Sequence, residues 1–151
     1  MFKQLMLFVM WMSIVASIVA VFARVWQPVE LEAYKAGTEL AARRMLEVAN
    51  QYKQEWLLQG KPAQIVVEGQ AVPLTRYGWV PLVDEQEQFA CQRWLALHYP
   101  DGKILDSSLQ AVRERWINQA YQCEFNYGFK QMIVVYQKDK IQKISADILS
   151  E

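Results

Sequence analysis

The sequence is poor in the residues that most often carry catalysis and metal binding. Among 151 residues it has one histidine, His98, and two cysteines, Cys91 and Cys123. It contains no CxxC pair, no Gly-x-Ser-x-Gly motif and no glycine-rich phosphate-binding loop. A single histidine is more often a core or surface residue than a general base. We therefore expect no catalytic residues, no metal, no cofactor and no small-molecule substrate.

An excess of either charge is also missing. Sixteen basic residues balance 16 acidic ones, which argues against a nucleic-acid partner, because such a protein needs a basic field to displace counterions from phosphates. Two acidic groups, Asp84/Glu85/Glu87 and Glu30/Glu32, fall where we expect helices to begin. Acidic side chains stabilise such positions, so we interpret both groups as structural rather than catalytic.

The first part of the chain has a long stretch without charge. No charged residue occurs from Gln4 to Ala23, with Lys3 before the stretch and Arg24 after it. A helix of this length measures about 30 Å, the thickness of the hydrocarbon core of a bilayer. Trp26 follows at the depth where an indole suits the membrane interface. We predict a membrane anchor over residues 1–27.

The anchor allows two further readings. Lys3 and the amino terminus favour a retained anchor with its N-terminus inside the cell and the domain outside. The alternative is a cleaved signal peptide, with Val21-Phe22-Ala23 as the cleavage site. The domain is exported in either case. One face of the helix carries small residues, which either admit a second helix at close range or reflect the ordinary composition of membrane helices. This candidate contact face consists of Ser13, Ala16, Ser17 and Ala20.

The two cysteines are a candidate disulfide. An even number of cysteines in an exported domain suggests pairing, although two free buried thiols are the alternative. A Cys91–Cys123 bond closes a loop of roughly 33 residues and contributes about 3–4 kcal/mol in the chain-entropy model.

The segment after Pro28 has helical periodicity as far as Leu58. Its apolar residues recur every three or four positions, and Gly60 followed by Lys61-Pro62 stops the helix. The stripe packs either on the domain's own sheet, which we favour, or on a helix of another protein. It comprises Tyr34, Thr38, Ala41, Met45, Val48, Tyr52 and Trp56.

The remainder mixes short helix and strand. We predict a hairpin over 64–74, turning at Glu68-Gly69, and a helix from Asp84 to about Leu97, with Glu87 completing a capping box. Residues 104–119 fit a helix or a strand. We predict an antiparallel meander of three strands at the end of the chain. The first has alternating apolar and polar residues from Tyr121 to Tyr127, the second is the apolar segment 132–136, and the third begins at Ile141.

The expected fold is therefore α+β: an N-terminal transmembrane helix continues into a long amphipathic helix that packs on an antiparallel sheet, with residues 28–151 as one exported domain.

This layout resembles that of type IV pilins and pseudopilins, and more narrowly that of MSHA (mannose-sensitive haemagglutinin) pilus biogenesis proteins. The segments that carry the resemblance are 52–60, 67–70 with Gly78-Trp79, 123–127 and 132–136, with Cys91 and Cys123 as the cysteine pair. The resemblance implies a single-pass inner-membrane protein with a pilin-like periplasmic domain that contacts pilins or pilus assembly-platform proteins.

The chain also departs from the prepilin pattern. No glycine-ended basic leader precedes the apolar stretch, and no acidic residue occurs before Glu30. We therefore expect an accessory protein that prepilin peptidase does not process, rather than a major fibre subunit. The alternative is a membrane-anchored periplasmic ligand-binding or sensory module, with Trp79, Trp94 and Trp116 lining a pocket instead of packing in a core.

Overall fold

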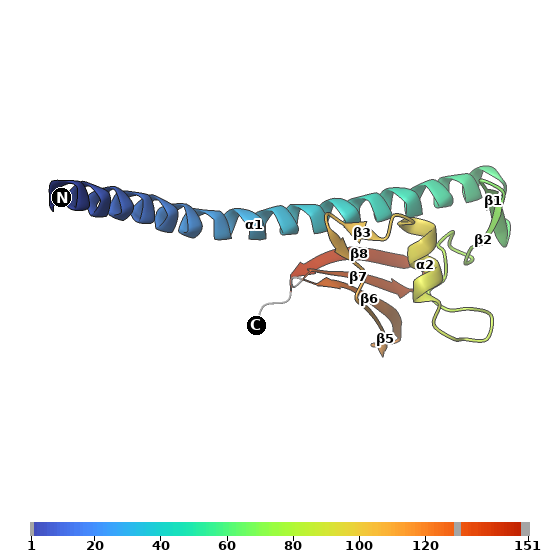
Figure 1. The fold of residues 1–151 in the computed structure, drawn as a ribbon. Helices are drawn as coiled ribbons and strands as arrows, with labels where there is room; N and C mark the ends of the chain where they lie inside the picture. The colour runs from blue at the N-terminus through green and yellow to red at the C-terminus, as the bar shows by residue number, and fades with distance from the viewer. Residues whose placement is uncertain (1, 129–130, 149–151) are drawn as a thin grey trace. The chain divides into compact units, whose positions relative to one another are not determined.

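The computed structural model describes residues 2–128 and 131–148. The chain divides into two compact units, Met1–Tyr34 and Lys35–Glu151. One helix, α1 (Phe2–Leu58), begins in the first unit and ends in the second (Figure 1). With its antiparallel sheets, the protein has the α+β fold class that the sequence predicted.

The first unit consists of the N-terminal part of α1, and the expected anchor of residues 1–27 lies within it. Side chains 2–26 are all exposed. The helix continues through residue 28, so Pro28 does not begin a new helix, and Glu30 and Glu32 are not at a helix start. The prediction that they stabilise a helix N-terminus is therefore wrong. They lie inside a continuous helix, where the partial charge of an end is absent.

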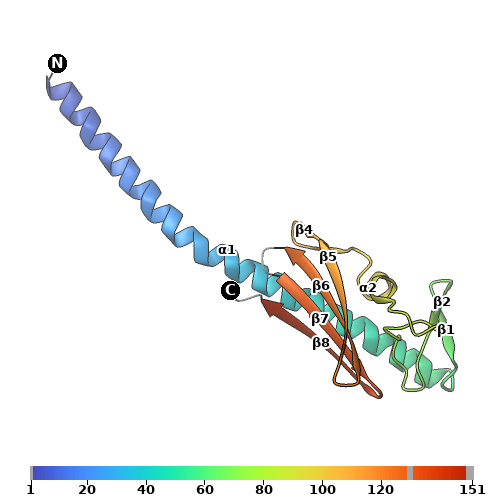
Figure 2. The same ribbon diagram turned by 90° about the horizontal axis from the view of Figure 1, so that it is seen from below.

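In the second unit, the apolar stripe of α1 packs on the chain's own sheet. Thr38, Ala41, Met45 and Trp56 are buried, as the spacing predicted, and the last three share one apolar core with residues of the sheet. Figure 2 shows this part of α1 running along the sheet.

The helix ends where the sequence predicted. The amide of Lys61 donates to the carbonyl of Trp56 at 2.8 Å, and Gly60 has a φ of 80°, a left-handed conformation that glycine adopts without strain.

The next element is the predicted hairpin. Strands β1 (Gln64–Val67) and β2 (Gln70–Pro73) pair antiparallel. The turn residues Glu68 and Gly69 both have positive φ, 51° and 79°, as a two-residue turn that matches the twist of the strands requires.

The predicted helix from Asp84 is wrong at its start. Helix α2 spans Cys91–His98, and Asp84 lies in the preceding loop, where its carboxylate accepts hydrogen bonds from the amides of Gln86 and Gln88, both at 2.9 Å. Glu87 has a φ of 60°, which a right-handed helix excludes. The aspartate therefore closes a local turn, a competing use of the same side chain.

The undecided segment forms strands. Two short ones, β3 (Lys103–Ile104) and β4 (Ser107–Ser108), make a hairpin. The main sheet is the predicted antiparallel meander, in the order β5-β6-β7-β8. Its strands are β5 (Ala111–Ile117), β6 (Ala120–Gly128), β7 (Gln131–Lys138) and β8 (Ile141–Ile148).

The inner face of the sheet supplies most of the core. Cys123, Phe125 and Tyr127 alternate along β6 and are fully buried, and Ile133 and Val135 pair with them from β7. The loop that contains Val80 and Leu82 is bonded to the sheet through the side chain of Gln137 on β7. The amide of Gln137 accepts from the backbone N–H of Leu82 at 2.9 Å and donates to the carbonyl of Val80 at 3.1 Å.

Candidate functional site

The apolar part of α1 is one candidate site. This helix is long and apolar enough to cross a membrane, by its length and composition. Its exposed side chains include Leu7, Ile14 and Phe22, which are 58%, 51% and 61% accessible. Large apolar side chains around a whole helix are stable only when lipid or another protein covers them.

The expected contact face carries no unsatisfied hydroxyl. Ser13 Oγ donates to the carbonyl of Val9 at 2.9 Å, and Ser17 Oγ donates to that of Ser13 at 2.8 Å. Both serines therefore satisfy their polar groups inside the helix, as a lipid environment requires. Ala16 and Ala20 add no side-chain bulk beyond a methyl group, so this face can be approached closely.

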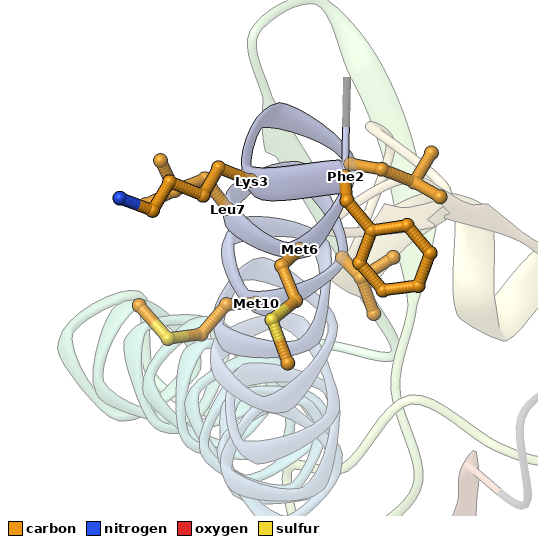
Figure 3. A pocket seen from close by; sticks show the side chains of 7 residues that line it. Phe2, Lys3, Met6, Leu7 and Met10 are labelled. Carbon is orange, nitrogen blue, oxygen red and sulfur yellow. The ribbon is translucent and has the colours of Figure 1, made fainter.

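A hollow near the N-terminal end is also part of this surface. Figure 3 shows Phe2, Lys3, Met6, Leu7 and Met10 projecting from different sides of α1. Every residue that lines the hollow belongs to α1. It is the space between neighbouring side chains of one helix.

The two cysteines join α2 to the sheet. Cys91 at the start of α2 is disulfide-bonded to Cys123 in the middle of β6, with their Cα atoms 5.7 Å apart. Both side chains are fully buried, so the pairing that the sequence suggested holds the helix to the inner face of the sheet.

His98 is buried in the core at the other end of α2 from Cys91. Its ring stacks on Trp94, and its Nδ1 is 2.8 Å from the carbonyl of Trp94. Burial lowers the pKa of His98 to about 4, although the hydrogen bond to Trp94 opposes the shift. The imidazole is therefore neutral at pH 7 and is packed rather than presented to a substrate.

Two tyrosines that border this region are also perturbed. Burial, and then the neighbouring Tyr99, raise the pKa of the Tyr127 hydroxyl well above its ordinary value. Burial, and then the carboxylate of Glu68, raise the pKa of Tyr52, whose hydroxyl donates to the carbonyl of Leu97 at 2.9 Å. Both hydroxyls stay protonated and serve packing.

The three tryptophans considered for a pocket do not come together in one. Trp94 is fully buried and Trp79 is 9% accessible, whereas Trp116 on β5 is 56% accessible. Trp79 donates from Nε1 to the carbonyl of Lys140 at 3.0 Å, and Trp116 packs on Tyr121. Two of the three are thus structural, and the third lies on the surface.

Another hollow lies in the second unit. It is lined by Thr75, Arg76, Tyr77, Pro81, Val83, Tyr121, Gln137 and Asp139. Its volume of about 210 Å³ is below the roughly 300–1,000 Å³ of typical ligand sites, so it offers little room for a ligand-binding or sensory role.

The acidic groups do not assemble into a metal centre. Glu85 and Glu87 are exposed in the loop before α2, and within residues 2–128 and 131–148 no three His, Cys, Asp or Glu side chains are grouped to hold a metal ion. Arg43 and Arg44 are likewise exposed on α1.

Sequence reasoning missed the surface that β5 presents. It left residues 104–119 undecided, so it could not place Trp116 at a sheet edge. The alternation of Val112, Glu114 and Trp116 with Arg113 and Arg115 was the available signal.

Comparisons with known protein families, with curated protein sequences and with solved structures found no match to this chain.

Proposed function

We propose that this chain is a non-enzymatic, single-pass inner-membrane accessory protein of type IV pilus biogenesis, of the MSHA type, which acts through contacts with other proteins in the membrane and the periplasm. The observation that carries the proposal is the layout of α1. One helix combines a surface suited to lipid with a stripe that packs on an antiparallel meander, the arrangement of pilin-like proteins.

The disulfide supports a location outside the cytoplasm. Such bonds persist in oxidising compartments, and the periplasm is one of them. A buried bond between Cys91 and Cys123 therefore favours a topology in which the second unit is periplasmic and the segment before the span is cytoplasmic.

The contact face of the membrane helix is the proposed meeting point with pilins or assembly-platform helices. Helices associate in lipid through close packing of small residues, and Ser13, Ala16, Ser17 and Ala20 provide such a strip. The second unit would make the periplasmic contacts.

The proposal is tested by substituting residues of this contact face in a way that preserves insertion of the helix into the membrane. In the double variant Ala16→Leu/Ala20→Leu, the bulk fills the strip while the helix remains apolar. The matched control, Val15→Leu/Phe22→Leu, changes the opposite face of the helix. Each variant is expressed at native level in a deletion strain of the native cell.

The expected result is loss of surface piliation and of co-purified pilins or platform proteins in the first variant only. The readouts are electron microscopy and mass spectrometry after gentle detergent extraction. A deletion strain with normal piliation would refute the pilus role altogether, and equal piliation in both double variants would refute the contact face.

A further inference from the structure

Strand β5 forms an open edge of the main sheet. Its only strand neighbour in the described parts of the chain is β6. Six of its seven residues are exposed, and Val112 is half-buried. In Figures 1 and 2, β5 is the outermost strand of the sheet. One edge of its backbone therefore has hydrogen-bonding groups free to pair with another chain.

The two faces of β5 differ in chemistry. Val112, Glu114 and Trp116 pair with Phe125, Cys123 and Tyr121 of β6, so they share the inner face of the sheet. Because side chains alternate along a strand, Arg113 and Arg115 lie on the outer face. The edge thus presents apolar groups around one carboxylate on one face, and two guanidinium groups on the other.

The exposed apolar side chains of β5 are unusual for an edge strand that is protected against aggregation. Natural edge strands are usually blunted by charged residues, which discourage aggregation, and Arg113 and Glu114 fit that role. Trp116, however, is 56% accessible and Ile117 is 37% accessible. Trp116 is already anchored, since its ring centroid lies 4.4 Å from that of Tyr121. An ordered and exposed indole of this kind is typical of the centre of an interface.

The outer face of this edge carries two arginines and one carboxylate, Glu124 of β6. Arg115 Nε is 3.2 Å from the carboxylate of Glu124, a side chain that is 6% accessible. Within the described residues, Arg113 has no ion pair, although it pairs with Glu124 in the strand register. The buried carboxylate is thus paired with one of the two arginines, and an additional acidic group on a neighbouring strand would pair with the other.

We propose that β5 accepts an extended segment of a partner protein as a fifth strand of the sheet. This segment carries acidic residues beside Arg113 and Arg115 on the outer face and aliphatic residues beside Val112 and Trp116 on the inner face. Backbone pairing supplies affinity, and the alternating side chains supply selectivity.

A second copy of this chain does not meet these requirements. Two identical strands related by a two-fold axis must place one residue opposite its own copy. If that residue is Glu114, two carboxylates meet, and Arg113 faces Arg115 of the other copy. A pairing centred on either arginine brings two guanidinium groups together. Like charges directly opposite each other are destabilising. A pairing centred on Val112 or Trp116 avoids them, but it places Ala111 or Ile117 opposite an arginine instead of an acidic residue. No pairing with a second copy therefore supplies the acidic groups that a partner of opposite charge provides.

The inference rests on this edge alone and does not require the partner to be a pilus protein. It can therefore fail or succeed independently of the proposed function.

The test uses the full chain in detergent micelles and two synthetic peptides. The probe is the labelled heptapeptide Thr-Val-Glu-Lys-Glu-Val-Thr, which reads the same in both directions and so suits either strand orientation. The matched control is Thr-Val-Lys-Glu-Lys-Val-Thr, which has the same length and strand propensity but inverted charges. Binding is measured by fluorescence anisotropy, and hydrogen–deuterium exchange locates the site.

The expected result is that the acidic probe binds at least tenfold more tightly than the control peptide and slows exchange in residues 111–117. Arg113→Glu should reverse this preference, while Arg44→Glu, an equal charge change on α1, should leave it unchanged. N-methylation of the probe backbone should abolish binding.

Equal affinity for the two peptides, or no binding of either at millimolar concentration, would overturn the proposal and leave the charges as simple protection of the edge. Protection of residues 111–117 that grows with protein concentration, in the absence of peptide, would assign the edge to a second copy instead.

Discussion

The imidazole of His98 lies flat against the indole of Trp94, with ring centroids 3.8 Å apart and planes inclined by 14°. The ring of Tyr52 meets the same imidazole edge-on at 5.5 Å. A proton on His98 would place a charge among aromatic rings, away from water, and this explains the direction of its pKa shift.

The fold should therefore lose stability in mild acid. His98 has a pKa of about 4 in the folded chain against an ordinary value of 6.5, so the unfolded chain binds the proton first as the pH falls. The contribution of His98 to the free energy of unfolding is fully present above pH 6.5. It decreases as the pH falls towards 4 and is constant below that, with a total loss of about 3 kcal/mol. Denaturant unfolding followed by circular dichroism between pH 7 and 5 measures the decline. In His98→Phe the decline over this interval should be much smaller, and an unchanged slope would show that other groups cause it.

The disulfide should contribute substantially to the stability of the second unit. The bonded cysteines are separated by 32 positions in sequence, and opening such a loop costs about 3–4 kcal/mol in the chain-entropy model. The double variant Cys91→Ser/Cys123→Ser should unfold at correspondingly lower denaturant concentration. Added reductant should shift the native chain towards the variant and leave the variant unchanged. Coincident unfolding curves for the two proteins would contradict the prediction.

Gly78 should be far less tolerant of a side chain than Gly69. Both have positive φ, 78° and 79°, so alanine costs about 1–2 kcal/mol of backbone strain at either position. At Gly78 the added Cβ would also lie 2.5 Å from the indole of Trp56, whereas at Gly69 nothing lies within 4 Å. Gly78→Ala should therefore cost a further 1–3 kcal/mol or so, the usual penalty of overpacking. Thermal unfolding of the two variants side by side tests this, and equal melting temperatures would count against the tight contact.

The apolar part of α1 should hold the chain in the membrane. The native protein should stay in the pellet when membranes are extracted with alkaline carbonate. Val15→Arg places a charge near the middle of the uncharged stretch, at about 2.5–3.5 kcal/mol on insertion scales, and should release part of the protein. Leu31→Arg, on the same helix beyond that stretch, should not. Release of the native protein would favour a cleaved or peripheral N-terminus.

The periodic parts of the fold were predictable because burial alone specifies them. The stripe from Thr38 to Trp56 and the alternation from Tyr121 to Tyr127 each follow the repeat of one element, and both are observed. The hairpin at Glu68-Gly69 was equally clear, since few residues accept the required backbone angles.

The wrong and undecided predictions concern segments whose residues fit two local structures. Asp84 suits a helix cap and an isolated turn equally well, and only the positive φ of Glu87 shows which of the two applies. The segment around Val112 and Trp116 fits both periods, because its strand is exposed on both faces and so has no strong apolar pattern. The β5 edge was missed for the same reason, because the alternation along this short segment did not by itself exclude a helix.

Gln137 joins the loop at Val80 and Leu82 to the sheet, in addition to the backbone hydrogen bond between Ala90 and Leu82. A carboxamide has the same donor and acceptor as a peptide group, so this side chain acts on the loop as one extra link of backbone would. The link begins on β7, the interior strand between β6 and β8. The loop is consequently coupled to an interior strand of the sheet, and moving it away from the sheet requires breaking both bonds to Gln137.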